Sequence, residues 1–153
     1  MDYQQTFLNL PKLTIRENAG HLVTTPEQCA QRFEHTAELA QEVFSVLTLD
    51  TKNREIDRHT ITIGTLNSSL VHPREVFRVA ITDNAAAIIL SHNHPSGDAT
   101  PSSEDIKVTK QLVGAGEVMG IKVLDHVIIG RKAIDSMRDS FLSLRESGLV
   151  QFN

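Results

Sequence analysis

The sequence predicts a single α/β domain in which helices sandwich a mixed β-sheet. Residues 42–64 hold two segments rich in β-branched and apolar residues around a turn at 50–53, a pattern typical of an antiparallel hairpin. Residues 85–90 (AAAIIL) are apolar throughout, as expected of a strand that is buried on both faces. Segments with helix start and stop signals alternate with these strands, so we expect helices on both sides of the sheet.

Local signals set the expected boundaries. Thr25 followed by Pro26 combines a hydroxyl cap with proline at the first helical position, and Pro73 marks a second helix start. The expected elements of the first half are an extended arm or short strand (1–24), a helix (25–40), two hairpin strands (42–49 and 55–64) and a helix (73–82). Those of the second half are a buried strand (85–90), a turn-rich loop (93–101), a helix (102–119), a buried strand (121–129) and a short helical segment (133–146). The domain is expected to span 25–147, between the arm at 1–24 and a tail at 148–153.

Composition restricts the classes of function. The chain of 153 residues is long enough for one hydrophobic core, and its formal net charge of -4 argues against a protein held mainly by nucleic-acid phosphates. Cys29 is the only cysteine, which excludes an intramolecular disulfide and a zinc site built from several thiolates. The N-terminus lacks the pattern of a secretory signal, and no apolar stretch approaches transmembrane length, so we expect a cytoplasmic protein with no membrane contact.

Two histidines follow the apolar run, in the string Ser91-His92-Asn93-His94-Pro95. Residues two apart on a strand point to the same side, so His92 and His94 can direct two imidazoles to one point. Ligands usually bind at the carboxyl ends of strands in open α/β sheets. Taken alone, such a pair is more often made of surface or hydrogen-bonded histidines than of metal ligands.

A carboxylate follows on the next predicted helix. With Ser102 as the cap, Asp105 lies in the first turn, and the loop with Gly97 and Pro101 can fold that turn back over the strand end. Asp105 would then add an oxygen to two nitrogens, which is the three-ligand set of catalytic zinc, although spacing alone does not exclude other divalent metals. The alternative is a simple cap with an acid that the helix dipole favours; Asp98 is the next candidate ligand.

His92-x-His94-Pro95 followed by Ser102-x-x-Asp105 resembles the JAMM motif of the MPN metalloprotease superfamily, which includes deubiquitinating and related isopeptidases. The strings His92-Asn-His-Pro-Ser-Gly-Asp98, Thr65-Leu-Asn-Ser-Ser-Leu-Val-His-Pro-Arg-Glu75 and Leu124-Asp-His-Val-Ile-Ile-Gly130 resemble the bacterial RadC-like branch more closely. The resemblance covers roughly residues 25–147. It implies an MPN-like sheet, with an architecture like that of cytidine deaminases, and one zinc ion per chain.

The resemblance also implies a role for each matching residue. His92, His94 and Asp105 match the zinc ligands. Glu42 matches the family's general base, which takes a proton from the water and returns one to the leaving amine, whereas its position alone would suggest a surface acid. Ser102 matches the motif serine, whose hydroxyl stabilises the oxyanion.

Three other positions bear on function. Asp125 and His126 are expected to point opposite ways on the last predicted strand. Either one of them orients a metal ligand, or the two form a charge pair at the edge of the sheet. Asn93 lies between the histidines, where eukaryotic isopeptidases usually have Ser or Thr, and this argues against ubiquitin-like substrates. RadC-like proteins often carry an N-terminal helix-hairpin-helix DNA-binding region, for which residues 1–24 leave no room, so a role in DNA repair is weakly supported.

Two classes of function stay open. The first is a zinc-dependent peptidase or isopeptidase that cleaves an amide bond in a peptide or protein substrate. The second is a non-catalytic MPN-like module that binds protein or DNA partners. A nucleobase deaminase is excluded because it needs two cysteines, a cupin barrel conflicts with the helix after Ser102, and an amidohydrolase barrel needs about 250 residues. The sequence does not predict an oligomeric state.

Overall fold

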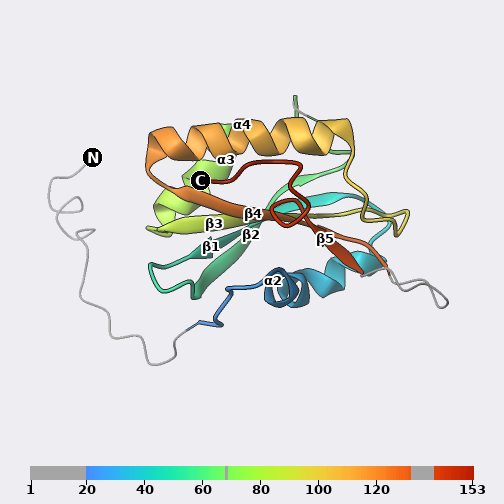
Figure 1. Ribbon diagram of the computed structural model, residues 1–153, viewed down its shortest axis with the longest axis horizontal. Coiled ribbons are helices and arrows are strands. Elements are labelled where there is room, and N and C mark those ends of the chain that lie inside the picture. The colour runs from blue at the N-terminus through green and yellow to red at the C-terminus, as the bar shows by residue number, and fades with distance from the viewer. Residues whose placement is uncertain (1–19, 68, 132–139) are drawn as a thin grey trace, which may run out of the picture.

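A mixed five-stranded sheet in the order β2-β1-β3-β4-β5 forms the centre of the computed structural model (Figure 1). The structure describes residues 20–67, 69–131 and 140–153. The strands are β1 (Val43–Leu49), β2 (Glu55–Ile63), β3 (Ala87–Asn93), β4 (Lys122–Ile129) and β5 (Phe141–Ser143). β3 and β4 run parallel, whereas β1 pairs antiparallel with β2 and β3, and β5 pairs antiparallel with β4. The predicted α/β class with a mixed sheet is confirmed.

Helices cover both faces of this sheet (Figure 1). They are α2 (Pro26–Phe33), continued by the 3₁₀ helix η1 (Glu34–Glu38), then α3 (Pro73–Thr82) and α4 (Ser103–Met119). β3 contacts the helices on both faces of the sheet, because neighbouring residues of a strand face opposite sides. Ile89 joins Cys29 and Phe33 of α2 in one apolar cluster. Leu90 joins Leu112 of α4 in a second cluster on the other face.

The helix starts follow the predicted caps. Thr25 accepts a hydrogen bond from the backbone N–H of Gln28, whose side chain in turn accepts from the backbone of Thr25. Ser102 and Asp105 form a second reciprocal capping box at the start of α4. Gly120 ends α4 in the left-handed conformation, with φ of 69°, which glycine adopts without steric cost.

Some predicted boundaries are wrong. The helix predicted to reach Ala40 changes to a 3₁₀ helix after Phe33, and η1 ends at Glu38. The strand predicted over 85–90 begins at Ala87 and extends to Asn93. Ser91 and His92 continue the pairing with β1 and β4, and Asn93 continues the pairing with β4.

The helical segment predicted over 133–146 is also wrong where the structure describes it. Residues 141–143 form β5, which pairs with the end of β4, and residues 144–148 form turns. The short strand satisfies backbone groups of β4 that would otherwise lie at an unpaired edge. Residues 132–139 lie outside the described part, as do residues 1–19 of the predicted arm. From the arm, Leu22 forms an isolated antiparallel bridge with Arg54.

A bulge in β4 decides which face its polar residues meet. Ile88 pairs with Val123 but Ile89 pairs with Asp125, so Leu124 is an extra residue. An extra residue reverses the alternation of the side chains that follow it. As a result Asp125 faces the α2 side of the sheet and His126 contacts α4.

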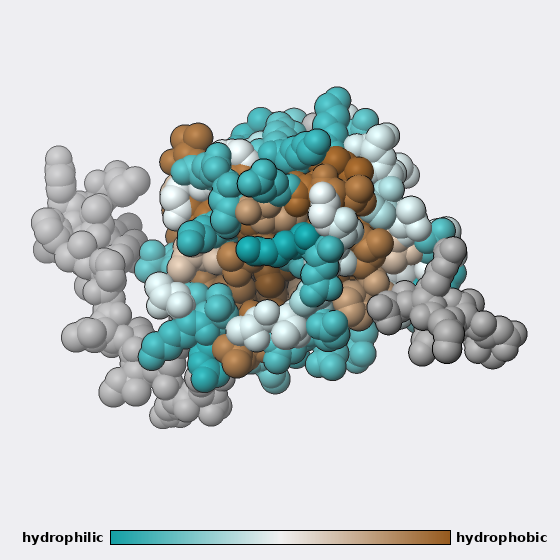
Figure 2. Space-filling model, in the orientation of Figure 1, coloured by the Kyte–Doolittle hydropathy of each residue, from teal (hydrophilic) through white to brown (hydrophobic). Residues whose placement is uncertain are grey.

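Figure 2 shows an apolar area at the centre of one face, with hydrophilic residues around it. None of the helices in the described ranges combines the length and the apolar character needed to cross a bilayer.

Candidate metal centre

The candidate ligands lie where β3 ends and α4 begins, at one end of the molecule (Figure 1). His92 is the penultimate residue of β3, His94 follows the strand directly, and Asp105 lies in the first turn of α4. The side chains of His92 and Asp105 are 0% and 1% exposed, while 13% of the His94 side chain is accessible. The loop between strand and helix therefore folds back as its glycine and prolines predicted.

The ligand atoms of these residues converge. The Nε2 atoms of His92 and His94 lie 2.9 Å apart. Nε2 of His92 lies 3.2 Å from Oδ1 of Asp105, and Nε2 of His94 lies 3.1 Å from Oδ2. In a tetrahedral zinc site the ligand atoms are roughly 3.3 Å apart, given metal–ligand bonds of about 2.0–2.1 Å. Two imidazole nitrogens and a carboxylate at these separations fit a zinc ion after a small expansion.

The loop after β3 fixes the ring of His94. Nδ1 of His94 lies 2.7 Å from the backbone carbonyl oxygen of Asp98, and because a carbonyl only accepts, Nδ1 must carry the hydrogen. Nε2 of the neutral ring then holds the lone pair. Gly130 supports this loop, since a Cβ at that position would lie 2.4 Å from the carbonyl oxygen of Gly97.

Asp98, the substitute ligand that the sequence suggested, does not bring its carboxylate to the other ligand atoms. Its Oδ1 accepts hydrogen bonds from the backbone N–H and the hydroxyl of Thr100, at 3.0 and 2.7 Å. Asp98 therefore acts on the site through its backbone carbonyl.

The electrostatics of the site favour a cation among these groups. Burial alone would raise the pKa of Asp105, but hydrogen bonds to His92 and His94 hold that pKa well below its ordinary range. Burial by itself would lower the pKa of His94, but the hydrogen bonds to Asp105 and to the backbone of Asp98, together with the charges of Asp105 and Glu42, raise that pKa overall. Lone pairs and a carboxylate this close repel one another unless a proton or a metal ion lies between them.

Glu42 lies immediately before β1 and faces the same point. Its Oε1 lies 3.9 Å from Nε2 of His94, and its Oε2 accepts a hydrogen bond of 2.7 Å from the backbone N–H of Leu66. Ligand atoms of Glu42, His92 and His94 all lie within 4.8 Å of one another. The side chain is 17% exposed, so Glu42 stands at the border between the buried ligands and solvent.

Asn93 positions Glu42, a role that the sequence reasoning missed. Its side chain is fully buried; Oδ1 accepts from the backbone N–H of Val43 at 2.7 Å, and Nδ2 donates to the carbonyl oxygen of Gln41 at 2.9 Å. These two bonds hold the backbone on both sides of Glu42. Alternation along β3 contained the signal, since Asn93 must point away from the two histidines and toward the far side of the strand.

Ser102 lies at the exposed N-terminus of α4, beside Asp105. Its Oγ accepts from the backbone N–H of Asp105 at 3.1 Å, and its own backbone N–H donates to Oδ2 of Asp105 at 2.8 Å. A hydroxyl that accepts a hydrogen bond still keeps its own hydrogen for donation. Capping therefore leaves Ser102 able to donate to a developing oxyanion, while it also orients the Asp105 carboxylate.

The two polar residues of β4 have different partners. Nε2 of His126 lies 2.7 Å from Nδ1 of His92. The carboxylate of Asp125 accepts from Oγ of Ser143 at 2.6 Å and from the backbone N–H of Arg145 at 3.1 Å. Of the two alternatives left open by the sequence, the geometry favours His126 as the residue that contacts a candidate ligand.

Residues 23–148 match the family model of the RadC-like JAB domain. The chain belongs to the RadC-like JAB domain family. A UPF0758 protein of Desulforamulus reducens is 52% identical over 130 residues, and one of Bacillus cereus strain B4264 is 54% identical over 129 residues. Each alignment covers 84% of this chain and 54% of the relative, so the chain spans about half the length of the curated relatives it matches.

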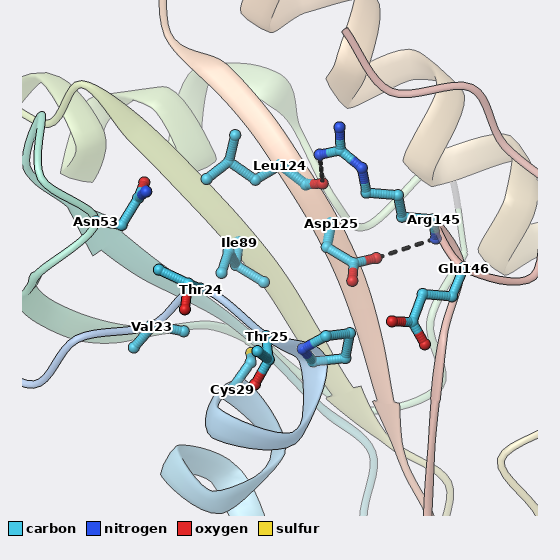
Figure 3. Close-up of a pocket in the computed structure, with 11 residues that line it drawn as sticks. Val23, Thr24, Thr25, Cys29, Asn53, Ile89, Leu124, Asp125, Arg145 and Glu146 are labelled. Carbon is cyan, nitrogen blue, oxygen red and sulfur yellow. Dashed lines mark hydrogen bonds between the residues drawn. The ribbon is translucent and has the colours of Figure 1, made fainter.

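The RadC-like JAB domain also contains a cavity of about 430 Å³ on the α2 face of the sheet (Figure 3). Ile89, Leu124 and Asp125 form part of its wall, and Arg145 lies above them. The Asp125 carboxylate in this cavity is already used in the hydrogen bonds to β5 and the turn after it. His92, Asp105 and His126 lie on the opposite face, where the histidine site is the candidate functional site.

A second group of side chains in the described ranges, Asp57, His59 and Asp83, also has the composition of a metal site. Oδ2 of Asp83 already contacts Nε2 of His59 and accepts from Oγ1 of Thr48, each at 2.6 Å. The Asp57 side chain is 63% exposed. The Asp83 carboxylate is therefore already used in a hydrogen-bond network between strands and helix.

Proposed function

We propose that this RadC-like JAB domain is a zinc-dependent metallohydrolase that cleaves an amide bond in a peptide or protein substrate. The observation that carries the proposal is the convergence of Nε2 of His92, Nε2 of His94 and the carboxylate of Asp105 at 2.9–3.2 Å, beside Glu42. A buried structural cluster has no need of a second carboxylate at its solvent border. Three protein ligands with an open side are typical of catalytic zinc.

The proposal divides the work between the cation and the chain. His92, His94 and Asp105 would hold one zinc ion, which supplies Lewis acidity toward a carbonyl and lowers the pKa of water. Glu42 acts as general base and then as general acid: its carboxylate accepts a proton from water and passes it to the amine that leaves. The backbone N–H of Leu66 holds one oxygen of this carboxylate, so the other is presented toward the histidines.

Ser102, at the start of α4, supports the same reaction. Its hydroxyl hydrogen remains available for donation, and a donor aimed at the developing oxyanion stabilises the transition state. Ser102 is exposed, and His94 and Glu42 are partly exposed. This exposure supports the proposal that an amide bond of a large substrate can reach these side chains. The net charge of -4 gives no support to nucleic acid as the substrate.

The first test is the metal content of the purified protein by mass spectrometry. We expect about one zinc per chain, and loss of the metal in His94→Ala. Asp105→Ala is expected to bind zinc more weakly while α4 persists, because the Ser102 hydroxyl still caps its backbone. Wild-type protein that stays free of metal after zinc is added would refute the metal site, and unchanged affinity in Asp105→Ala would refute that ligand.

The second test separates an enzyme from a binding module. Glu42→Gln keeps the size of the side chain and removes its basicity, so we expect retained zinc with turnover of a peptide substrate lowered by about 10²–10⁴-fold. Gln41→Ala, a change at the exposed neighbouring position, is the control and should leave turnover unchanged. If Glu42→Gln changed neither property, the domain would be better described as an MPN-like module that binds partners.

A further inference from the structure

A line of buried hydrogen bonds runs behind His92. Nδ1 of His92 lies 2.7 Å from Nε2 of His126, and Nδ1 of His126 lies 2.5 Å from Oγ1 of Thr109. Oγ1 of Thr109 in turn lies 2.6 Å from the backbone carbonyl oxygen of Asp105. His126 and Thr109 are both fully buried. The line begins at one candidate ligand and ends on the backbone of another.

The position of each hydrogen follows from the end of this line. The carbonyl oxygen of Asp105 can only accept, so the hydroxyl of Thr109 donates its one hydrogen there. The oxygen of Thr109 must then accept from Nδ1 of His126. Among the described residues His126 has no salt-bridge partner, and a fully buried imidazole without one is neutral.

A neutral His126 with hydrogen on Nδ1 has its lone pair on Nε2. That lone pair faces Nδ1 of His92, which must therefore carry a hydrogen and donate it. The only remaining lone pair of His92 is on Nε2, which is 3.2 Å from the carboxylate of Asp105. The opposite tautomer would point an N–H at the same place and could not bind a cation there.

We propose that Thr109 and His126 are positioning residues that fix the tautomer of His92, so that its Nε2 presents a lone pair to the metal ion. The inference rests on the proposed metal site. The bulge at Leu124 belongs to this arrangement, because it turns His126 toward α4 and away from α2. Phe44 packs its ring at 5.7 Å from that of His126, and this contact limits rotation of the imidazole.

The test is a pair of matched variants at one position. Thr109→Val keeps the shape of the side chain and removes the hydroxyl, so Nδ1 of His126 loses its acceptor and its hydrogen is free to move to Nε2. His126 would then donate to His92 and push the His92 hydrogen onto Nε2. We expect zinc affinity, measured by competition with a chelator, to fall by about 10–100-fold. Thr109→Ser retains the hydroxyl and is expected to stay near the wild-type affinity.

The tautomer itself is measured in the metal-free protein by long-range ¹H–¹⁵N NMR of ¹⁵N-labelled histidine. Wild type and Thr109→Ser should show His92 with hydrogen on Nδ1, and Thr109→Val should show a mixed or reversed tautomer. A purely structural role for Thr109 would not move this signal. Hydrogen on Nε2 of His92 in the wild type, or wild-type zinc affinity in folded Thr109→Val, would overturn the inference. A wild type with the expected tautomer but no zinc binding would overturn the proposed function and leave the tautomer assignment standing.

Discussion

Replacing Asn93 by alanine tests how the site holds Glu42, the proposed general base. The Asn93 side chain is 0% exposed and bonds to the backbone of Val43 and Gln41, at 2.7 and 2.9 Å. In Asn93→Ala the N–H of Val43 and the carbonyl of Gln41 lose their partners. Glu42 lies between these two groups, so the same change releases the backbone that orients its carboxylate.

The expected size of the effect follows from these two bonds. A buried backbone group left without a partner costs about 1–3 kcal/mol. Gln41 is exposed, so water can reach its carbonyl and the cost there is at the low end of this range. We therefore expect the free energy of unfolding to fall by about 2–4 kcal/mol. For a domain of this size that corresponds to a melting temperature lower by roughly 4–16 °C.

Urea and thermal unfolding of the metal-free protein measure this loss without any contribution from bound zinc. Gln41→Ala is the matched control, since it removes an exposed side chain but keeps the carbonyl that Asn93 bonds. We expect the control to stay within about 0.5 kcal/mol of the wild type. Equal stabilities of Asn93→Ala and Gln41→Ala would show that the two hydrogen bonds do not hold the segment around Glu42.

Two further predictions concern the fold around the site. Gly116→Ala should lower the free energy of unfolding by about 1–3 kcal/mol, because the added Cβ would lie 2.5 Å from the carbonyl oxygen of Ile121. Gly114→Ala, on the same helix with nothing within 4 Å, should instead raise it by about 0.4–1 kcal/mol, and like signs in urea unfolding would refute this packing argument. Burial raises the pKa of Asp125, so the folded state holds that proton more tightly than the unfolded state; the resulting stability is present at low pH and is lost as pH rises through the raised pKa. Asp125→Asn should flatten the dependence of melting temperature on pH between the ordinary carboxyl range and neutrality, and an unchanged profile would contradict the assignment.

Sequence patterns predicted the layers of this fold because those layers depend on local signals. Apolar runs, proline starts and hydroxyl caps are read from a few neighbouring residues, and they correctly predicted a mixed sheet between helices. The end of β3 was harder to predict, because Ser91, His92 and Asn93 are polar yet belong to the strand and are buried. A pattern based on hydrophobicity ends a strand where its polar residues begin. β5 has only three residues, too few for any periodicity.

Part of the candidate site could likewise be predicted from local spacing, and part of it could not. The pairing of His92 with His94, and the cap that carries Asp105, depend on spacings of two and three residues, and the structure brings these groups together. The contacts of His126 depend on a one-residue bulge and on a helix 17 residues away, neither of which alternation can reveal. Asn93 was visible as a residue between two histidines, but its partners lie about 50 residues earlier in the chain.

The side chains of the candidate site come from two separate parts of the chain, and this affects how the family can diverge. His92, His94, Asp105 and His126 all come from the continuous unit β3–α4–β4, whereas Glu42 comes from the segment before β1. In the proposed site, the groups that hold the cation and the group that moves the proton can therefore mutate independently. A lineage that lost only the glutamate would keep the groups proposed to hold the ion and would keep its fold, but it would lose the proposed hydrolysis. Relatives with an intact histidine unit but a different residue at position 42 are where such a transition should be sought.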